Sequence, residues 1–223
     1  MTERGGPPLP WVCLVTDRTV CKDGVVGLER AVMGALDSGV NMVQLREKGL
    51  PARELCELGQ RIRRLTTEAG AALLVNDRVD VALAVRADGV HLGQDSLPVS
   101  VARGLVGDRL VGRAVHGLAE AVQAEKDGAD YLMVGTIFHS ESHPEFPPAG
   151  PRLIRKVKTK VKAPLVAIGG ITPENAAQTI ANGASGVAVI RAILADPHPE
   201  QAAHRLVEHV RAAWPSAVLH RGA

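Results

Sequence analysis

Eight short apolar runs alternate with eight longer segments of helical periodicity, and no other feature limits the fold of this chain so strongly. The runs are rich in Val, Leu and Ile and predict strands at 12–15, 41–46, 72–76, 89–92, 109–114, 131–135, 165–168 and 186–190. The segments between them repeat apolar residues three and four positions apart and predict helices at 25–38, 52–69, 79–85, 97–106, 118–127, 153–161, 175–182 and 201–214. Because the runs are continuously apolar, they are typical of parallel strands buried on both faces.

Glycines mark the ends of several of these units. Gly39, Gly70, Gly128 and Gly183 each follow a helical segment and precede a strand, where a left-handed residue is needed. The strict alternation predicts an α/β fold, a single (β/α)8 TIM barrel that spans residues 1–223 as one domain, with a flexible N-terminal segment at 1–10. An open doubly wound sheet is the alternative, but no G-x-G-x-x-G follows the first strand.

Composition excludes several classes of protein. The chain has 26 Lys and Arg against 24 Asp and Glu, and 2% aromatic residues, which argues against a nucleic-acid partner. No apolar run reaches the roughly 18 residues of a membrane span. The first ten residues lack the hydrophobic core of a signal peptide, and the three cysteines are scattered as in reduced proteins. We therefore expect a cytoplasmic protein with no membrane partner, which could form a homo-oligomer.

The residues that follow the last two strands indicate an anion site. TIM barrels build their active sites at the carboxyl ends of the strands and often bind phosphate after strands seven and eight. Gly169 and Gly170 follow strand seven, so that backbone N–H groups and the next helix could meet an anion. Arg191 follows strand eight and adds a guanidinium beside them. A phosphorylated small molecule is the predicted ligand, although paired glycines could also merely form a tight turn.

The second and third strands end in charged residues. Arg46 and Lys48 could hold a second anion, or they could form a solvated ion pair with Glu47. Asn76 and Asp77 follow the third strand, and Asp77 could either cap the next helix or bind Mg²⁺ on a phosphate.

Histidine and hydroxyl side chains supply further candidates. His116 follows the fifth strand and is a candidate for moving a proton, with His91 after the fourth strand as its rival. The sixth strand leads into a long loop at 136–150, and loops of this length often bind ligands. Its hydroxyl groups on Ser140 and Ser142 could bind phosphate oxygens.

Six segments at these strand ends, in this order, resemble one family, that of thiamine phosphate synthase and its relative thiazole tautomerase. They are LVTD (14–17), VQLREK (43–48), VNDRVDVAL (75–83), ADGVHLGQ (87–94), GADYLMVGTIF (128–138) and VAIGGITPEN (166–175). The resemblance implies a TIM barrel that acts on thiazole and pyrimidine precursors of thiamine. For a synthase it implies that Mg²⁺ accompanies the leaving diphosphate, with Asp77 as a metal ligand and with Arg46, Lys48 and Asn76 serving the pyrimidine diphosphate.

The chain departs from the synthase pattern at the metal and diphosphate contacts. The second carboxylate of the pattern is replaced by Ser96, with Asp95 one place early, and the serine of G-x-S-x-H is Ala114. The diphosphate-binding T-x-T-K becomes SESH at 140–143. The segment 112–131 instead looks like the tautomerase branch, whose catalytic histidine matches His116.

We therefore expect a thiazole tautomerase, an isomerase without cofactor, that aromatises the thiazole carboxylate phosphate by a proton shift. His116 would take and return the proton, Arg46 would hold the carboxylate, and the glycines at 169–170 would hold the phosphate. The alternative is a Mg²⁺-dependent thiamine phosphate synthase, in which Asp95 replaces the shifted aspartate. A third possibility is a non-catalytic regulator that binds thiazole phosphate.

Overall fold

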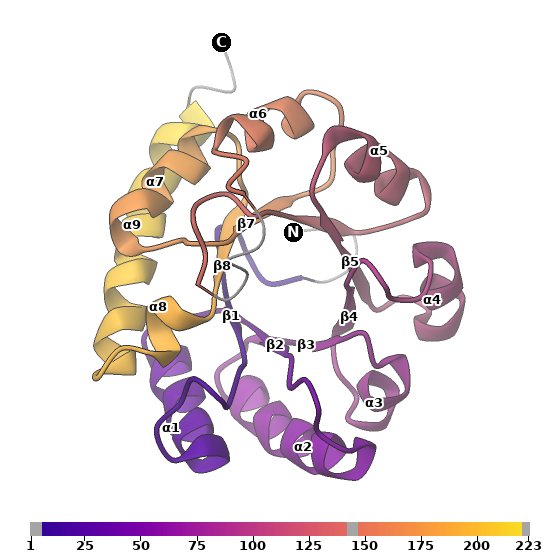
Figure 1. Ribbon diagram of the computed structural model, residues 1–223, viewed down its shortest axis with the longest axis vertical. Coiled ribbons are helices and arrows are strands. Elements are labelled where there is room, and N and C mark those ends of the chain that lie inside the picture. Colours follow the sequence, from indigo (N-terminus) through magenta and orange to yellow (C-terminus); the bar gives the residue numbers. More distant parts are fainter. Residues whose placement is uncertain (1–5, 142–146, 220–223) are drawn as a thin grey trace.

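Eight parallel strands, each hydrogen-bonded to the next along the chain, close into a barrel because β8 also pairs with β1 (Figure 1). The computed structural model describes residues 6–141 and 147–219. The strands are β1 (Trp11–Val15), β2 (Met42–Leu45), β3 (Ala72–Asn76), β4 (Gly89–Leu92), β5 (Leu110–Val115), β6 (Tyr131–Val134), β7 (Leu165–Ile168) and β8 (Gly186–Val189). The predicted (β/α)8 barrel is confirmed.

Helices lie around the outside of the strands (Figure 1). They are α1 (Gly24–Asp37), α2 (Ala52–Glu68), α3 (Val79–Ala84), α4 (Val99–Val106), α5 (Leu118–Lys126), α6 (Arg152–Lys158), α7 (Pro173–Ala181), α8 (Arg191–Leu194) and α9 (Pro199–Leu219). Each predicted helix is present, with ends shifted by a few residues. The short helix α8 was not predicted, because four residues are too few to show a 3.6-residue period.

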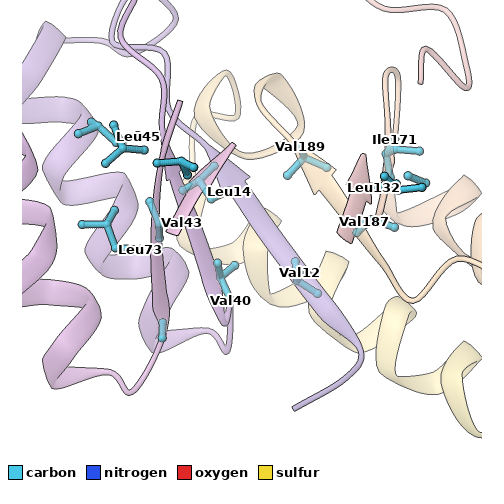
Figure 2. Packing of buried hydrophobic residues seen from close by; sticks show 14 of the residues in the cluster. Val12, Leu14, Val40, Val43, Leu45, Leu73, Leu132, Ile171, Val187 and Val189 are labelled. Carbon is cyan, nitrogen blue, oxygen red and sulfur yellow. The ribbon is translucent and has the colours of Figure 1, made fainter. Parts of the chain in front are cut away.

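Two apolar layers hold the barrel together. The larger layer packs the outward faces of the strands against the helices, and Figure 2 shows Val12, Leu14 and Val43 among its residues. The smaller layer fills the barrel interior and includes Trp11, Tyr131 and Leu110. Burial of such side chains stabilises the fold by about 1.5–3 kcal/mol each.

Inward-facing glycines make room for the largest interior side chains. A Cβ atom at Gly112 would lie 2.0 Å from Tyr131 Cζ, and one at Gly186 would lie 2.7 Å from Trp11 Cβ. Both large rings are fully buried, and they meet edge to face with centroids 5.7 Å apart. Small residues on one strand therefore allow the neighbouring strand to project a ring into the barrel.

The amino ends of the strands contact the segment that precedes β1. The side-chain amide of Asn41 donates to the carbonyl oxygens of Pro8 and Pro10, at 3.1 and 3.0 Å. The indole of Trp11 donates to the carbonyl of Pro7 at 2.8 Å. Pro7, Pro8 and Pro10 of the predicted flexible segment thus accept hydrogen bonds at this end of the barrel, and residues 1–5 lie outside the described part. None of the described helices has an apolar stretch long enough to span a bilayer.

Candidate active site

A cavity of about 660 Å³ opens at the carboxyl ends of the strands. Its inner part is lined by the buried side chains Val15, Met133 and Ala188, together with the polar Gln44 and His91. Its outer part carries the exposed polar and charged groups, namely Lys48, Asp77, Asp95, His116 and Arg191. The cavity lies at the carboxyl ends of the strands, where the sequence predicts the site. It has an apolar interior and a charged mouth.

The turn between β7 and α7 requires both of its glycines. Gly169 and Gly170 have φ angles of 95° and 62°, which side chains rarely adopt. A Cβ atom at Gly170 would lie 2.2 Å from the backbone oxygen of His139, so that the turn packs directly against the β6–α6 loop. Thr172 and Asn175 form a capping box at the start of α7, and Asn175 Nδ2 also donates to the carbonyl of Gly170 at 2.8 Å. The cap therefore fixes the glycine turn at a helix N-terminus.

Arg191 and Ser140 line the same cavity as the glycine turn. Arg191 Nε lies 2.8 Å from Glu141 Oε2, which ties α8 to the β6–α6 loop through an exposed ion pair. One donor of the guanidinium is thus already used, and the Nη groups are the ones that a phosphate could engage. Ser142 and His143 lie outside the described residues.

The two basic residues after β2 are not neutralised by Glu47. The Glu47 side chain is 1% exposed and pairs with Arg18, whose Nη1 and backbone N–H both donate to it at 3.1 Å. Within the described ranges, neither Arg46 nor Lys48 has an ion-pair partner. The expected alternative, a solvated pair with Glu47, is therefore wrong, because the carboxylate is buried and bonded to Arg18 in the β1–α1 loop. Arg46 and Lys48 both line the cavity, and their positive charges can bind an anion there.

The Asp77 side chain accepts hydrogen bonds from neighbouring polar groups and does not cap a helix. Helix α3 has no side-chain cap, so that the predicted alternative of Asp77 as its N-cap is wrong. Asp77 Oδ1 instead accepts hydrogen bonds from the Gly93 backbone N–H at 2.8 Å and from the Ser96 hydroxyl. Asp77 Oδ2 accepts from Asn76 Nδ2 at 2.6 Å, and Asn76 Oδ1 accepts from Gln44 Nε2 at 2.8 Å.

The donor groups present fit an Mg²⁺ ion that is shared with a substrate. The described residues contain no cluster of three or more His, Cys, Asp or Glu side chains that would enclose a metal by themselves. Asp77 and Asp95 both line the cavity and follow β3 and β4, the next two strands of the barrel after β2, which precedes Arg46 and Lys48. Magnesium in phosphate chemistry is usually held by one or two carboxylates plus substrate phosphates, so the number and type of these side chains fit an ion that a diphosphate carries.

Gln44 is a site residue that we did not single out from the sequence. Its Oε1 is fully buried and has no hydrogen-bond partner among the described residues. An unsatisfied buried acceptor costs about 1–3 kcal/mol, which a ligand N–H would recover. The available signal was a polar residue inside an otherwise apolar strand, β2, on the same face as Arg46.

The two candidate histidines occupy different environments. His91 is 3% exposed, and its Nδ1 lies 3.0 Å from the hydroxyl of Tyr131. Burial lowers the pKa of His91 from 6.5 to about 4, so that the imidazole is neutral at physiological pH. His116 is exposed at the cavity mouth, and its backbone N–H donates to Glu120 Oε2 at 2.8 Å. Both residues line the cavity, as the sequence predicts.

A closed barrel with a glycine turn before α7 and free cations after β2 is typical of TIM-barrel proteins that act on phosphorylated small molecules. The family model described as thiamine monophosphate synthase matches residues 12–193. The chain therefore belongs to the thiamine monophosphate synthase family, which confirms the resemblance.

Individual relatives agree with this assignment. A thiamine-phosphate synthase of Moorella thermoacetica is 52% identical over 184 residues, which cover 82% of this chain and 88% of the relative. One of Natronomonas pharaonis is 48% identical over 189 residues, which cover 83% and 88%. Among solved structures, a thiamine phosphate pyrophosphorylase from Pyrococcus furiosus has a TM-score of 0.84 at 38% identity and covers 91% of this chain and 96% of its own.

Our expectation of a thiazole tautomerase is wrong on these comparisons, because the two relatives are named thiamine-phosphate synthase and the solved structure is named thiamine phosphate pyrophosphorylase. Ala114 removes a single hydroxyl, and Ser96 speaks against a synthase only if the protein has to supply most ligands of the metal. An ion that arrives on a diphosphate relaxes that requirement. The isomerase assignment, the role of His116 as its proton carrier and the absence of a cofactor therefore lose their basis.

Proposed function

We propose that this protein is a thiamine-phosphate synthase, a transferase that joins hydroxymethylpyrimidine diphosphate to thiazole phosphate with Mg²⁺ and releases diphosphate. The observation that carries the proposal is that two separate groups of residues able to bind an anion line the same cavity. Arg46 and Lys48, which have no ion-pair partner among the described residues, follow β2 next to Asp77 after β3, and the glycine turn at 169–170 follows β7. The names of the relatives support the same activity. A cytoplasmic location goes with this proposal.

The phosphate groups bind at the cavity mouth. The diphosphate oxygens bind to Arg46, Lys48 and Asn76. Arg46 and Lys48 are cations and form charge-assisted hydrogen bonds with them. The backbone N–H groups of Gly169 and Gly170 bind the thiazole phosphate at the start of α7. Ser140 and the Nη groups of Arg191 donate to phosphate oxygens from the two neighbouring loops, and Ser142, which lies outside the described residues, stays a candidate from the sequence.

The rings bind in the inner part of the cavity. Val15, Met133 and Ala188 provide apolar walls that exclude water from the reacting groups. Gln44 Oε1, which is buried without a partner, accepts a hydrogen bond from an N–H group of the pyrimidine. The cavity thereby holds the pyrimidine methylene carbon and the thiazole nitrogen next to each other.

In the reaction, the bond between the methylene carbon and the diphosphate oxygen breaks, and a bond from that carbon to the thiazole nitrogen forms. The electron pair of the broken bond leaves with the diphosphate, and the nitrogen becomes positively charged without losing a proton. Arg46 and Lys48 stabilise the negative charge that develops on the leaving oxygen. Asp77 and Asp95 would hold a Mg²⁺ ion together with the diphosphate, and the ion would supply positive charge to the leaving group. Since no proton is transferred, this reaction needs no base at His116.

The test is the formation of thiamine phosphate from the two substrates. We expect Mg²⁺-dependent product and diphosphate release, abolished by EDTA and reduced at least about 100-fold by Asp77→Ala, since one charged contact in a transition state is worth several kcal/mol. Asp80→Ala is the matched control, because Asp80 is exposed on α3 and pairs with Arg78 outside the cavity. Failure of the unmodified protein to form thiamine phosphate with both substrates and Mg²⁺ would refute the proposal.

A further inference from the structure

We propose that His91 is a substrate-binding residue that donates a hydrogen bond from Nε2–H to a ring nitrogen of the pyrimidine, and that Tyr131 is the positioning residue for it. This inference rests on the proposed function and names the group that the inner cavity recognises. It depends on the position of His91, on the direction of its hydrogen bond with the Tyr131 hydroxyl, and on the types of side chain that line the cavity.

Three neighbouring strands place the two side chains together. His91 on β4 is in register with Gly112 on β5, and Gly112 is in register with Tyr131 on β6. A Cβ atom at Gly112 would lie 2.3 Å from the Tyr131 hydroxyl oxygen, so that only glycine lets the phenol cross β5. The phenol and imidazole rings stack with centroids 5.7 Å apart, and Tyr131 Oη lies 3.0 Å from His91 Nδ1.

The direction of this hydrogen bond follows from the burial of Tyr131. The phenol is fully buried, and its hydroxyl has one hydrogen-bond partner among the described residues, His91 Nδ1. If Nδ1 carried the proton, the buried O–H of Tyr131 would have no acceptor, which is unfavourable. Tyr131 therefore donates to Nδ1, and the imidazole proton lies on Nε2.

The opposite nitrogen of the imidazole faces the cavity. In the described part of the chain, no side chain or carbonyl accepts a hydrogen bond from His91 Nε2. This nitrogen is not among the fully enclosed atoms without a partner, which are Gln44 Oε1 and Arg103 Nε. Because His91 lines the cavity, its Nε2–H is a fixed donor on the inner wall.

The surroundings select the acceptor. Phosphate groups bind at the mouth, where Lys48 is exposed, whereas the buried part of the cavity that His91 lines also carries apolar side chains such as Val15 and Met133. The charged groups that act on His91 are Asp77, Arg113 and Arg46, and Asn76 on β3 is in register with it. An aromatic ring fits this inner part, and the acceptor on it is a ring nitrogen. The thiazole nitrogen uses its lone pair for the new bond to carbon, so that the hydrogen bond from His91 belongs to the pyrimidine.

Binding measurements on three variants test the role of His91. His91→Leu removes the donor, His91→Gln keeps an amide donor of similar reach, and Met42→Leu is a control in the same interior layer. We expect His91→Leu to weaken binding of the pyrimidine diphosphate about 10-fold, as for loss of one buried hydrogen bond. His91→Gln should recover most of this loss, and inorganic pyrophosphate with Mg²⁺ should bind all variants within about twofold.

A ligand without ring nitrogens isolates the contact. Benzyl diphosphate keeps the leaving group but has no acceptor in its ring, so that the preference for the pyrimidine should fall about 10-fold in His91→Leu. For Tyr131 the readout is ¹⁵N NMR of the imidazole at neutral pH. The unmodified protein should carry the proton on Nε2, and Tyr131→Phe should show both tautomers and an intermediate loss of pyrimidine binding.

Three results would overturn the inference while the proposed function stands. These are a wild-type His91 protonated on Nδ1, unchanged pyrimidine binding in His91→Leu, or an equal loss for inorganic pyrophosphate, which would place His91 in the phosphate site. If the unmodified protein neither binds the pyrimidine diphosphate nor forms thiamine phosphate, the proposed function fails and this inference falls with it.

Discussion

Ser96 stands where the synthase pattern has its second carboxylate, and the replacement Ser96→Asp tests how positions 77 and 96 share a metal ion. The Ser96 hydroxyl donates to Asp77 Oδ1, which also accepts from the Gly93 backbone. An aspartate at position 96 would set two carboxylates against each other. Two unit charges about 4 Å apart repel by ~1 kcal/mol in bulk water and by ~4 kcal/mol at an effective dielectric constant of 20.

Without Mg²⁺ we therefore expect Ser96→Asp to lose about 1–4 kcal/mol of stability, which lowers the Tm by roughly 2–16 °C for a chain of this size. Added Mg²⁺ should restore the Tm of the variant, since the ion binds the folded pair of carboxylates. The unmodified protein, with fewer anionic ligands, should respond less until pyrophosphate is also present. Ser96→Asn is the control, because it has similar size without a charge.

The assay is thermal unfolding in low-salt buffer, where screening between exposed charges is weakest. Equal melting of Ser96→Asp and Ser96→Asn without Mg²⁺ would show that positions 77 and 96 do not face each other. If Mg²⁺ alone raised the Tm of the unmodified protein as much as that of Ser96→Asp, the protein would already hold a complete metal site. Our account of an ion shared with the diphosphate would then be wrong.

Three further predictions follow from single residues. Gly170→Ala should raise the KM for thiazole phosphate and cost about 1–3 kcal/mol of stability, because its Cβ would meet the His139 carbonyl, whereas Gly128→Ala, also at positive φ but with open space, should leave KM unchanged. Arg46→Met should raise the KM for the pyrimidine diphosphate about 10- to 100-fold with little change in urea unfolding, and Arg53→Met, exposed on α2, should leave that KM unaltered. Burial lowers the pKa of His91 from 6.5 to about 4, so the unfolded chain takes up the proton first and stability falls by about 3 kcal/mol as the pH drops between these values; His91→Gln should flatten that part of the urea-unfolding profile, and an unchanged slope would contradict it.

Periodicity predicted the barrel because strands and helices repeat with different spacing, and the barrel in turn predicted where the site lies. Gly169, Gly170, Arg46 and Asp77 were chosen as strand-end residues, and all of them line one cavity. The short helix α8 was missed because four residues show no period, and the predicted end of the last helix at 214 falls before Pro215, a residue type that usually ends a helix but that α9 includes.

The sequence did not predict which side chains from different strands and loops contact each other. The pairing of Glu47 with Arg18 leaves Arg46 and Lys48 free, whereas the charges at 46–48 by themselves allowed either an anion site or an ion pair with Glu47. The choice of tautomerase over synthase failed for a related reason. Residue identity at positions 96 and 114 was weighed as if each position acted alone, whereas a substrate phosphate can complete a metal site.

The order of apolar runs and glycines by itself determined the barrel topology and the end of the barrel that holds the site, because these depend on local periodicity and on the shared direction of parallel strands. Only the tertiary structure decided that Gly112 lets Tyr131 reach His91, and that Gln44 keeps an unpartnered acceptor in the cavity. These contacts join strands that are far apart in the chain, and they depend on which side chains are absent between them.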